Sequence, residues 1–176
     1  MADFTEPYPI REHLEAYLDI ETTGLSRDYD GITIVGVYLF SELKAKCIQL
    51  VGDEISAESV LKALEDVDTI YTYNGSRFDL PFIYCLLGID LTDGFAHHDL
   101  MYDCWKANLY GGLKSVEKQL GIKRKLNEVN GYEAVRLWWR YVDNDDATAL
   151  AKLIKYNRED VINLKILRDM LLQYVA

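Results

Sequence analysis

Short apolar runs separated by turns dominate the first half of the chain and predict β-strands. Four runs rich in β-branched and aromatic residues cover residues 17–24, 32–40, 44–51 and 68–73. Polar turns join the first three runs, which favours an antiparallel meander. The fourth run follows a helix predicted to begin at Ser56, and a strand reached through a helix is expected to lie parallel to the first strand.

Helical spacing of apolar residues dominates the second half. Helices are predicted from about residue 80, over residues 101–109, from residue 113 to Gly121, over residues 132–141 and from an acidic turn at 143–146 to about residue 174. A short strand is predicted around residues 96–100. Alternating strands and helices are typical of an α/β domain. At this length the chain is expected to form one domain, residues 1–176.

The composition is that of a globular protein in a reducing compartment. Apolar residues make up 49% of the chain, and no apolar run approaches the roughly 18 residues that span a bilayer, so no membrane partner is expected. The acidic first residues lack the basic start and apolar stretch of a secretion signal. Cys47, Cys85 and Cys104 are odd in number and widely separated, which argues against a disulfide framework and a cysteine metal site. A cytoplasmic location is predicted.

The charge is unevenly distributed. The formal net charge of −10 is unusual for a nucleic-acid binder, because phosphate contacts are normally made by Lys and Arg. Residues 105–141, however, hold eight basic residues, Arg124 among them, against three acidic ones, together with Trp138 and Trp139. Basic and aromatic groups in one segment are typical of proteins that bind single strands. This charge distribution is compatible with a protein that contacts a short piece of nucleic acid. It is equally compatible with a protein that binds no nucleic acid.

Two carboxylates on the first predicted strand are the first candidates for chemistry. In a strand, Asp19 and Glu21 project to one side while Leu18 and Ile20 point to the other. Like charges held this close stay ionised most easily when a cation lies between them, and a divalent metal is the obvious candidate. Taken alone, the pair is better explained as a strand end that faces water.

Polar residues follow the fourth predicted strand. Asn74, Phe78 and Asp79 lie between that strand and the next helix. Asp79 alone is equally well explained as a helix cap. Because ligands of open α/β sheets gather at the carboxyl ends of strands, Asp79 is also expected beside Asp19 and Glu21.

A tyrosine and an aspartate on the last predicted helix form the third candidate. Tyr156 and Asp160 are four residues apart and therefore share one helix face. Lys114 and Ser115, just after Gly111 and Gly112, begin a helix whose backbone N–H groups suit a phosphate, although this signal alone is weak.

Two neighbouring histidines are weaker candidates. His97 and His98 are adjacent on a short predicted strand, so at most one of them could join a given site, and a structural role is favoured for both. Asp99 is interpreted as a capping or supporting residue rather than a metal ligand.

The three stretches together resemble the three exonuclease motifs of the DEDD superfamily in its tyrosine (DEDDy) form. They are Asp19-x-Glu21, Asn74-x-x-x-Phe78-Asp79 and Tyr156-x-x-x-Asp160, in this order. With the stretches at 98–100 and 113–117, the chain is similar over nearly its whole length to the YprB-type ribonuclease-H-like domain, which is related to the proofreading domains of family-B DNA polymerases. This resemblance implies a ribonuclease-H-like α/β fold with a five-stranded mixed sheet and helices on both faces.

The resemblance also implies a role for each matching residue. Asp19, Glu21, Asp79 and Asp160 would hold two Mg²⁺ or Mn²⁺ ions, and Tyr156 would aim the attacking water, since an unperturbed phenol pKa of about 10 makes it a poor base. The remaining candidates would bind substrate: Thr22, Gly24, Leu25, Asn74, Phe78, Lys114 and Ser115.

The implied reaction is hydrolysis of the last phosphodiester at a 3′ end of DNA or RNA, releasing nucleoside 5′-monophosphates. The partner would be nucleic acid with a free, single-stranded 3′ end, and a protein partner could direct the domain to it. Two alternatives stay open. One is a catalytically silent module that binds nucleic acid or protein, which the four acids and Tyr156 disfavour. The other is a ribonuclease-H-like endonuclease, which the stretch around Asn74 disfavours.

Overall fold

The computed structural model describes residues 13–175 and shows one mixed sheet of five strands. The first six residues, on which the expected absence of a secretion signal depends, lie outside the described part. The strands are β1 (Glu15–Thr22), β2 (Ile32–Phe40), β3 (Ala45–Val51), β4 (Thr69–Thr72) and β5 (Ala96–Asp99), and their order in the sheet is β3-β2-β1-β4-β5. The first three form an antiparallel meander, whereas β4 lies parallel to β1 and β5 parallel to β4. The predicted sheet is confirmed.

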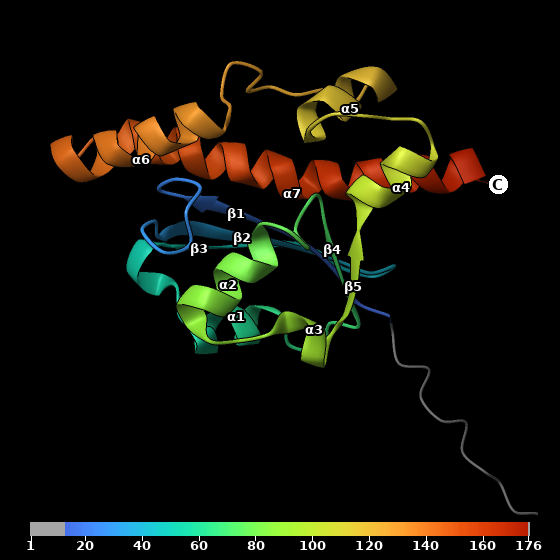
Figure 1. Ribbon diagram of the computed structural model, residues 1–176, viewed down its shortest axis with the longest axis horizontal. Coiled ribbons are helices and arrows are strands. Elements are labelled where there is room, and N and C mark those ends of the chain that lie inside the picture. The colour runs from blue at the N-terminus through green and yellow to red at the C-terminus, as the bar shows by residue number, and fades with distance from the viewer. Residues whose placement is uncertain (1–12, 176) are drawn as a thin grey trace, which may run out of the picture.

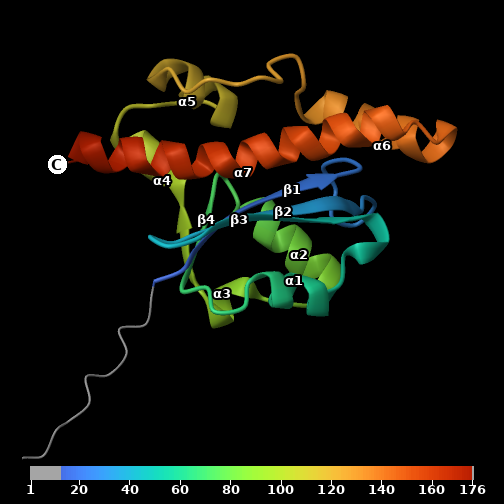
Figure 2. The same cartoon turned by 180° about the vertical axis from the view of Figure 1, so that it is seen from behind.

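Helices cover both faces of the sheet, as expected (Figures 1 and 2). One face carries α1 (Ala57–Ala63), α2 (Asp79–Leu87) and α3 (Leu91–Gly94), with the short 3₁₀ helix η1 (Gly52–Glu54) after β3. The other carries α4 (Leu100–Lys106), α5 (Leu113–Leu120), α6 (Gly131–Asn144) and the long α7 (Ala147–Val175), which crosses the whole sheet. Within residues 13–175, every helix is too short or too polar to span a bilayer.

The alternation of side chains along β1 divides the interior into two layers. Leu18 and Ile20 are buried in the cluster formed with α1 and α2. Tyr17, on the opposite side, is buried in the cluster that includes Leu164 and Leu167 of α7. Asp19 and Glu21 share the side of Tyr17 because side chains two apart in a strand face the same way. The packing of β1 therefore directs both carboxylates toward α7.

Candidate active site

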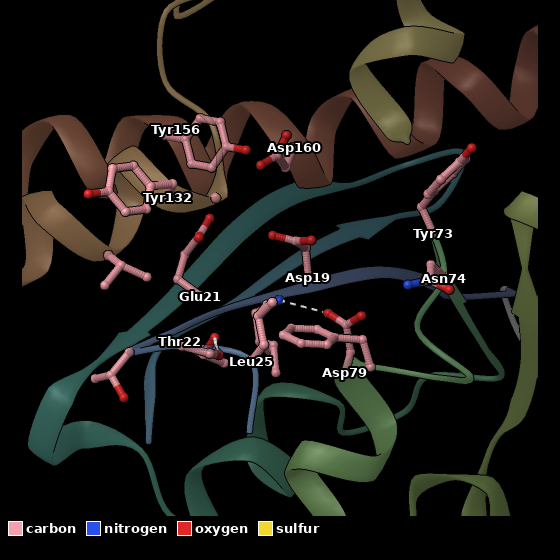
Figure 3. Close-up of a pocket in the computed structure, with 16 residues that line it drawn as sticks. Asp19, Glu21, Thr22, Leu25, Tyr73, Asn74, Asp79, Tyr132, Tyr156 and Asp160 are labelled. Carbon is pink, nitrogen blue, oxygen red and sulfur yellow. Dashed lines mark hydrogen bonds between the residues drawn. The ribbon is translucent and has the colours of Figure 1, made fainter. Parts of the chain in front are cut away.

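Three carboxylates meet between β1 and α7. Asp19 and Glu21 come from β1, and Asp160 comes from α7 one helical turn after Tyr156. Each of the three acids offers one oxygen within 4.8 Å of those of the other two. Figure 3 shows these groups converging on one cavity. We call Asp19, Glu21 and Asp160 the acid trio.

A buried amide fixes α7 against the strand that carries Asp19. Asn157 Nδ2 donates to Asp19 Oδ2 at 3.0 Å and to the Asp19 carbonyl at 3.3 Å. Gln49 Nε2 donates to Asn157 Oδ1 at 2.9 Å and so orients the amide. Asn157 also lies against Gly36 of β2, where an added Cβ would overlap with the amide group. A glycine at this position therefore lets the helix approach the sheet closely.

Replacing Gly36 with alanine is expected to lower the free energy of unfolding by about 1–3 kcal/mol, because the new methyl group must displace buried Asn157. Urea unfolding measures this loss. Gly31→Ala is the matched control, since a Cβ there would meet no atom within 4 Å. Equal stability of the two variants would show that Gly36 does not set the distance between helix and sheet.

Asp79 lies in the same cavity but outside the acid trio. It is the first residue of α2, and Phe78 is the N-cap. The Asp79 carboxylate accepts the backbone N–H of Ile20 at 3.0 Å. Its hydrogen bond therefore ties α2 to β1, in addition to any favourable interaction with the helix dipole.

The predicted substrate residues line two adjoining hollows. A cavity of about 550 Å³ is lined by Thr22, Gly24, Leu25, Asn74, Phe78, Asp79, Tyr156 and the acid trio. A second hollow of about 370 Å³ is lined by Lys114 and Ser115 at the start of α5. Asp19, Asp160 and Tyr156 line both, so they lie where the two hollows meet.

Asp99 supports the loop that carries Asn74. It is the N-cap of α4 and accepts the backbone N–H of Met101 at 3.1 Å, as predicted for a capping residue. It also accepts from the backbone N–H of Asn74 at 2.7 Å and from the Ser76 hydroxyl at 2.6 Å. Asn74 itself has a left-handed backbone with φ of 61°, which asparagine tolerates better than most residues.

The two histidines have structural partners, as favoured from the sequence. His97 Nε2 lies 2.9 Å from Thr72 Oγ1, and His98 pairs with Asp103. Neither histidine lines the two hollows.

Burial makes the charges of the site costly without a metal. Burial, followed by the charges of Asp160 and Asp79, raises the pKa values of Asp19 and Glu21 well above the usual carboxyl range. Burial also raises the pKa of Asp79 to about 7, against the effect of the Ile20 hydrogen bond. For Asp160, burial raises the pKa to about 6 although Arg124 opposes it.

The phenol of Tyr156 stays neutral. Burial, followed by the charges of Asp160 and Glu21, raises the Tyr156 pKa above its ordinary value. The neutral Tyr156 phenol can therefore donate a hydrogen bond at neutral pH.

Arg124 is not part of an exposed basic surface, contrary to its assignment with the segment 105–141. Its side chain is buried, donates to Glu117 through two nitrogens and also donates to Asp160. Asn163 Nδ2 donates to Glu117 at 2.9 Å and completes this buried network. Lys114 Nζ is likewise buried, 4.7 Å from the centre of the Tyr156 ring, and has no hydrogen-bond partner among the described residues.

The acid trio fits a divalent cation. Glu21 Oε1 is buried and has no hydrogen-bond partner within the described part of the chain. A buried acceptor without a donor costs free energy that a bound cation would recover. Carboxylate oxygens are the ligands that Mg²⁺ and Mn²⁺ prefer.

Several residues of the site are not evident from the sequence. Tyr73, Gly131, Tyr132 and Val135 also line the larger cavity. The signal that could have located Tyr132 is its place directly after an Asn-Gly helix start, with Val135 three residues later on the same helix face. Asn157 adjoins Tyr156, but nothing in the sequence indicates its contact with β1.

Comparison with known proteins agrees with this architecture. YprB of Bacillus subtilis (strain 168), an uncharacterized protein, is 28% identical over 163 residues, which cover 84% of this chain and 39% of YprB. The family B DNA polymerase of the archaeon Pyrobaculum calidifontis has a TM-score of 0.66 at 16% identity, over 91% of this chain and 24% of the polymerase. Brucella melitensis NrnC bound to pGG has a TM-score of 0.62 at 21% identity, over 97% of this chain and 76% of NrnC.

The similarity to the two solved structures shows the fold alone. The chain spans less than half the length of YprB and of the polymerase. The family match is more direct, since the family described as the RNase_H superfamily matches residues 16–172. The chain belongs to the RNase_H superfamily.

Proposed function

We propose that this chain acts as one exonuclease domain of the DEDDy type, which hydrolyses the terminal phosphodiester at a 3′ end of DNA or RNA. The observation that carries the proposal is the convergence of the acid trio in the larger cavity, with Asp19, Asp160 and Tyr156 at its junction with the second hollow. Four carboxylates around one cavity, three of them buried and Asp19 partly buried, are unfavourable without cations, so their convergence favours a metal site.

The acid trio would hold one divalent cation, and Asp79 would complete a second site with the neighbouring acids. In two-metal sites of this kind the ions activate a water and stabilise the attacking and departing oxygens of an in-line displacement. Arg124 holds one oxygen of Asp160, which leaves the other free to face the cavity.

The chain's own residues would place the substrate and the water. Tyr156 donates a hydrogen bond and so aims the water rather than deprotonating it. The Thr22 hydroxyl donates to the Gly24 carbonyl at 2.5 Å, which leaves its oxygen lone pairs to accept from a sugar hydroxyl. Asn74, Leu25 and Phe78 would enclose the terminal nucleoside.

The second hollow would receive a phosphate of the substrate. Lys114 and Ser115 line it at the first turn of α5. Lys114 supplies a positive charge without a hydrogen-bonding partner among the described residues, and the helix start adds backbone N–H groups. We further propose that the substrate is single-stranded nucleic acid and that a protein partner brings it to the site where targeting is needed.

One observation favours a catalytically silent binding module as the second candidate. The Arg124 guanidinium already pairs with Asp160, so one carboxylate of the trio has a cation supplied by the chain itself. In such a module, the hollows would bind nucleic acid and the acids would hold no metal.

Hydrolysis of 5′-labelled DNA and RNA oligonucleotides with Mn²⁺, Mg²⁺ or EDTA tests the proposal. We expect a ladder that shortens from the 3′ end with either metal, no cleavage in EDTA, and nucleoside 5′-monophosphates as products. Circular single-stranded DNA is the matched control and should stay intact, because it has no 3′ end. Cleavage of the circle would indicate an endonuclease. A wild type that cuts no substrate and binds no metal in calorimetry would favour the catalytically silent binding module.

A further inference from the structure

Two aromatic side chains on α4 stay exposed although the other face of this helix is buried. Leu100, Met101 and Cys104 hold α4 against the rest of the protein. Tyr102 and Trp105, three residues apart, share the outer face, and each is 37% exposed. Their rings meet edge to face with centroids 5.4 Å apart. Neither ring belongs to the three buried apolar clusters of residues 13–175, so core packing does not account for the pair.

An arginine without an acidic partner lies beside this pair. Arg77 is exposed in the turn after β4, and its guanidinium lies 5.8 Å from the centre of the Trp105 ring. The exposed Lys106, Arg136 and Arg140 each pair with an acid, whereas Arg77 forms no ion pair with any described residue. We call Tyr102, Trp105 and Arg77 the aromatic patch. A chain of net charge −10 thus presents an unpaired cation next to two exposed rings.

The aromatic patch adjoins the larger cavity. Asp99 accepts the backbone N–H of Asn74 at 2.7 Å and the Ser76 hydroxyl at 2.6 Å. The Ser76 hydroxyl also lies 3.4 Å from the Tyr102 hydroxyl. Asn74 lines the cavity, and Figure 3 shows it on the side of the acid trio away from Tyr132. The hydrogen bonds of Asp99 therefore fix the patch relative to this side of the cavity.

The chemistry of the patch favours single-stranded nucleic acid over a protein segment. Aromatic rings stack with bases of any sequence, and an arginine without a counter-ion can neutralise a backbone phosphate. A substrate that contacts both the patch and the acid trio requires a fixed geometry between them, whereas a separate protein partner does not. The hydrogen bonds between Asp99 and the loop of Asn74 provide that geometry.

We propose that the aromatic patch binds the single-stranded segment on the 5′ side of the terminal nucleotide. The inference rests on the proposed function, which places the 3′ end of the strand at the acid trio. Tyr102 and Trp105 stack with upstream bases, and Arg77 contacts a phosphate between them. Affinity consequently rises once the strand is long enough to reach the patch, and it does so without preference for base sequence.

Binding of a short and a longer strand separates the patch from the acid trio. The probes are thymidine and uridine dinucleotides and strands of about eight of the same nucleotides, with a phosphorothioate at the last linkage to slow cleavage. Calorimetry measures their affinities. Trp105→Ala should weaken binding of the longer strand about 5- to 150-fold and leave dinucleotide affinity unchanged. Trp105→Phe should keep most of the affinity, because it restores a ring.

Salt dependence separates the charge of Arg77 from stacking. Arg77→Ala should make the slope of log affinity against log salt for the longer strand less steep by about 0.7, the contribution of one phosphate contact on a single strand. Trp105→Ala should leave this slope unchanged. Arg158→Ala is the matched control, because it removes an exposed arginine near Cys47 of β3, the edge strand opposite β5. It should bind both strands like the wild type.

Two results would overturn the inference. One is an unchanged affinity of Trp105→Ala for the longer strand, which is expected if the patch binds a protein partner instead. The other is an equal loss for the dinucleotide and the longer strand, because it would show damage to the cavity or the fold rather than loss of an upstream contact. Thermal unfolding of Trp105→Ala distinguishes these two kinds of damage.

The outcomes also distinguish this inference from the proposed function. If the wild type cuts neither DNA nor RNA while its preference for the longer strand still depends on Trp105, the exonuclease proposal fails and the patch inference stands. If the wild type shortens oligonucleotides and Trp105→Ala matches it in KM at both lengths, the patch inference alone is overturned. A wild type that binds neither strand would overturn both.

Discussion

The Asp19→Asn variant is expected to lose about a thousandfold or more of the hydrolytic rate. The amide keeps the size of the side chain and can still hydrogen-bond to Asn157, so the fold is preserved. It removes one negative charge and one anionic ligand from the acid trio. Bound metals supply several kcal/mol of transition-state stabilisation, and each 1.36 kcal/mol changes the rate tenfold. The initial rate of oligonucleotide shortening with Mn²⁺ measures the loss.

The same variant is expected to be more stable than the wild type when no metal is present. Burial, followed by the charges of Asp160 and Asp79, raises the folded-state pKa of Asp19 above its unfolded value. Ionised Asp19 therefore destabilises the metal-free fold, and this cost grows as the pH rises from about 3.9 through the raised folded-state pKa. The stability advantage of Asp19→Asn should be present at about pH 8 and should fade toward about pH 4. Thermal unfolding in EDTA across this range measures it.

Asp53→Asn is the matched control for both effects, because it removes the same charge from an exposed position on η1. It should change neither the rate nor the pH dependence of unfolding. Two results would contradict the interpretation of the acid trio. One is an Asp19→Asn enzyme within tenfold of the wild-type rate. The other is a metal-free Asp19→Asn protein that is less stable than the wild type at about pH 8.

The sheet and the acids could be predicted from the sequence because their signals are local. Alternation along β1 fixes which side Asp19 and Glu21 take, and a spacing of four fixes the shared face of Tyr156 and Asp160. The helix between β3 and β4 likewise indicated that β4 lies parallel to β1. Local patterns of this kind predict which of the acidic side chains share a face of a strand or helix.

The remaining parts of the site depend on contacts between distant segments. A basic segment does not reveal that Arg124 is buried between Glu117 and Asp160, because the charges that hold it lie 7 and 36 residues away. Asn157 can bind Asp19 only because Gly36 of β2 leaves room for its amide. From the sequence alone, Gly36 is only a glycine within a predicted strand. Tyr132 resembled an ordinary residue near a helix start, and only the packing of α6 on α7 directs it toward the cavity.

Glu117→Ala is expected to lower the free energy of unfolding by about 3–5 kcal/mol, since it removes one partner of a buried ion pair. The Glu117 side chain is 1% exposed and accepts from Arg124 and Asn163. Its loss leaves a guanidinium without its main counter-ion and a buried amide without an acceptor. Urea unfolding in EDTA measures the change. Glu128→Ala is the control, because it breaks only a solvent-exposed pair with Lys152, and such exposed pairs contribute little to stability.

The double variant Glu117→Met with Arg124→Met shows whether charge balance or shape causes this loss. Removing both charges leaves no uncompensated guanidinium, so the double variant should lose less stability than the sum of the two single methionine variants. It also removes the cation that pairs with Asp160. Mn²⁺ should then raise the unfolding temperature of the double variant more than that of the wild type. Additive losses, with an unchanged response to Mn²⁺, would mean that Arg124 and Glu117 only fill space and do not balance the charge of the acid trio.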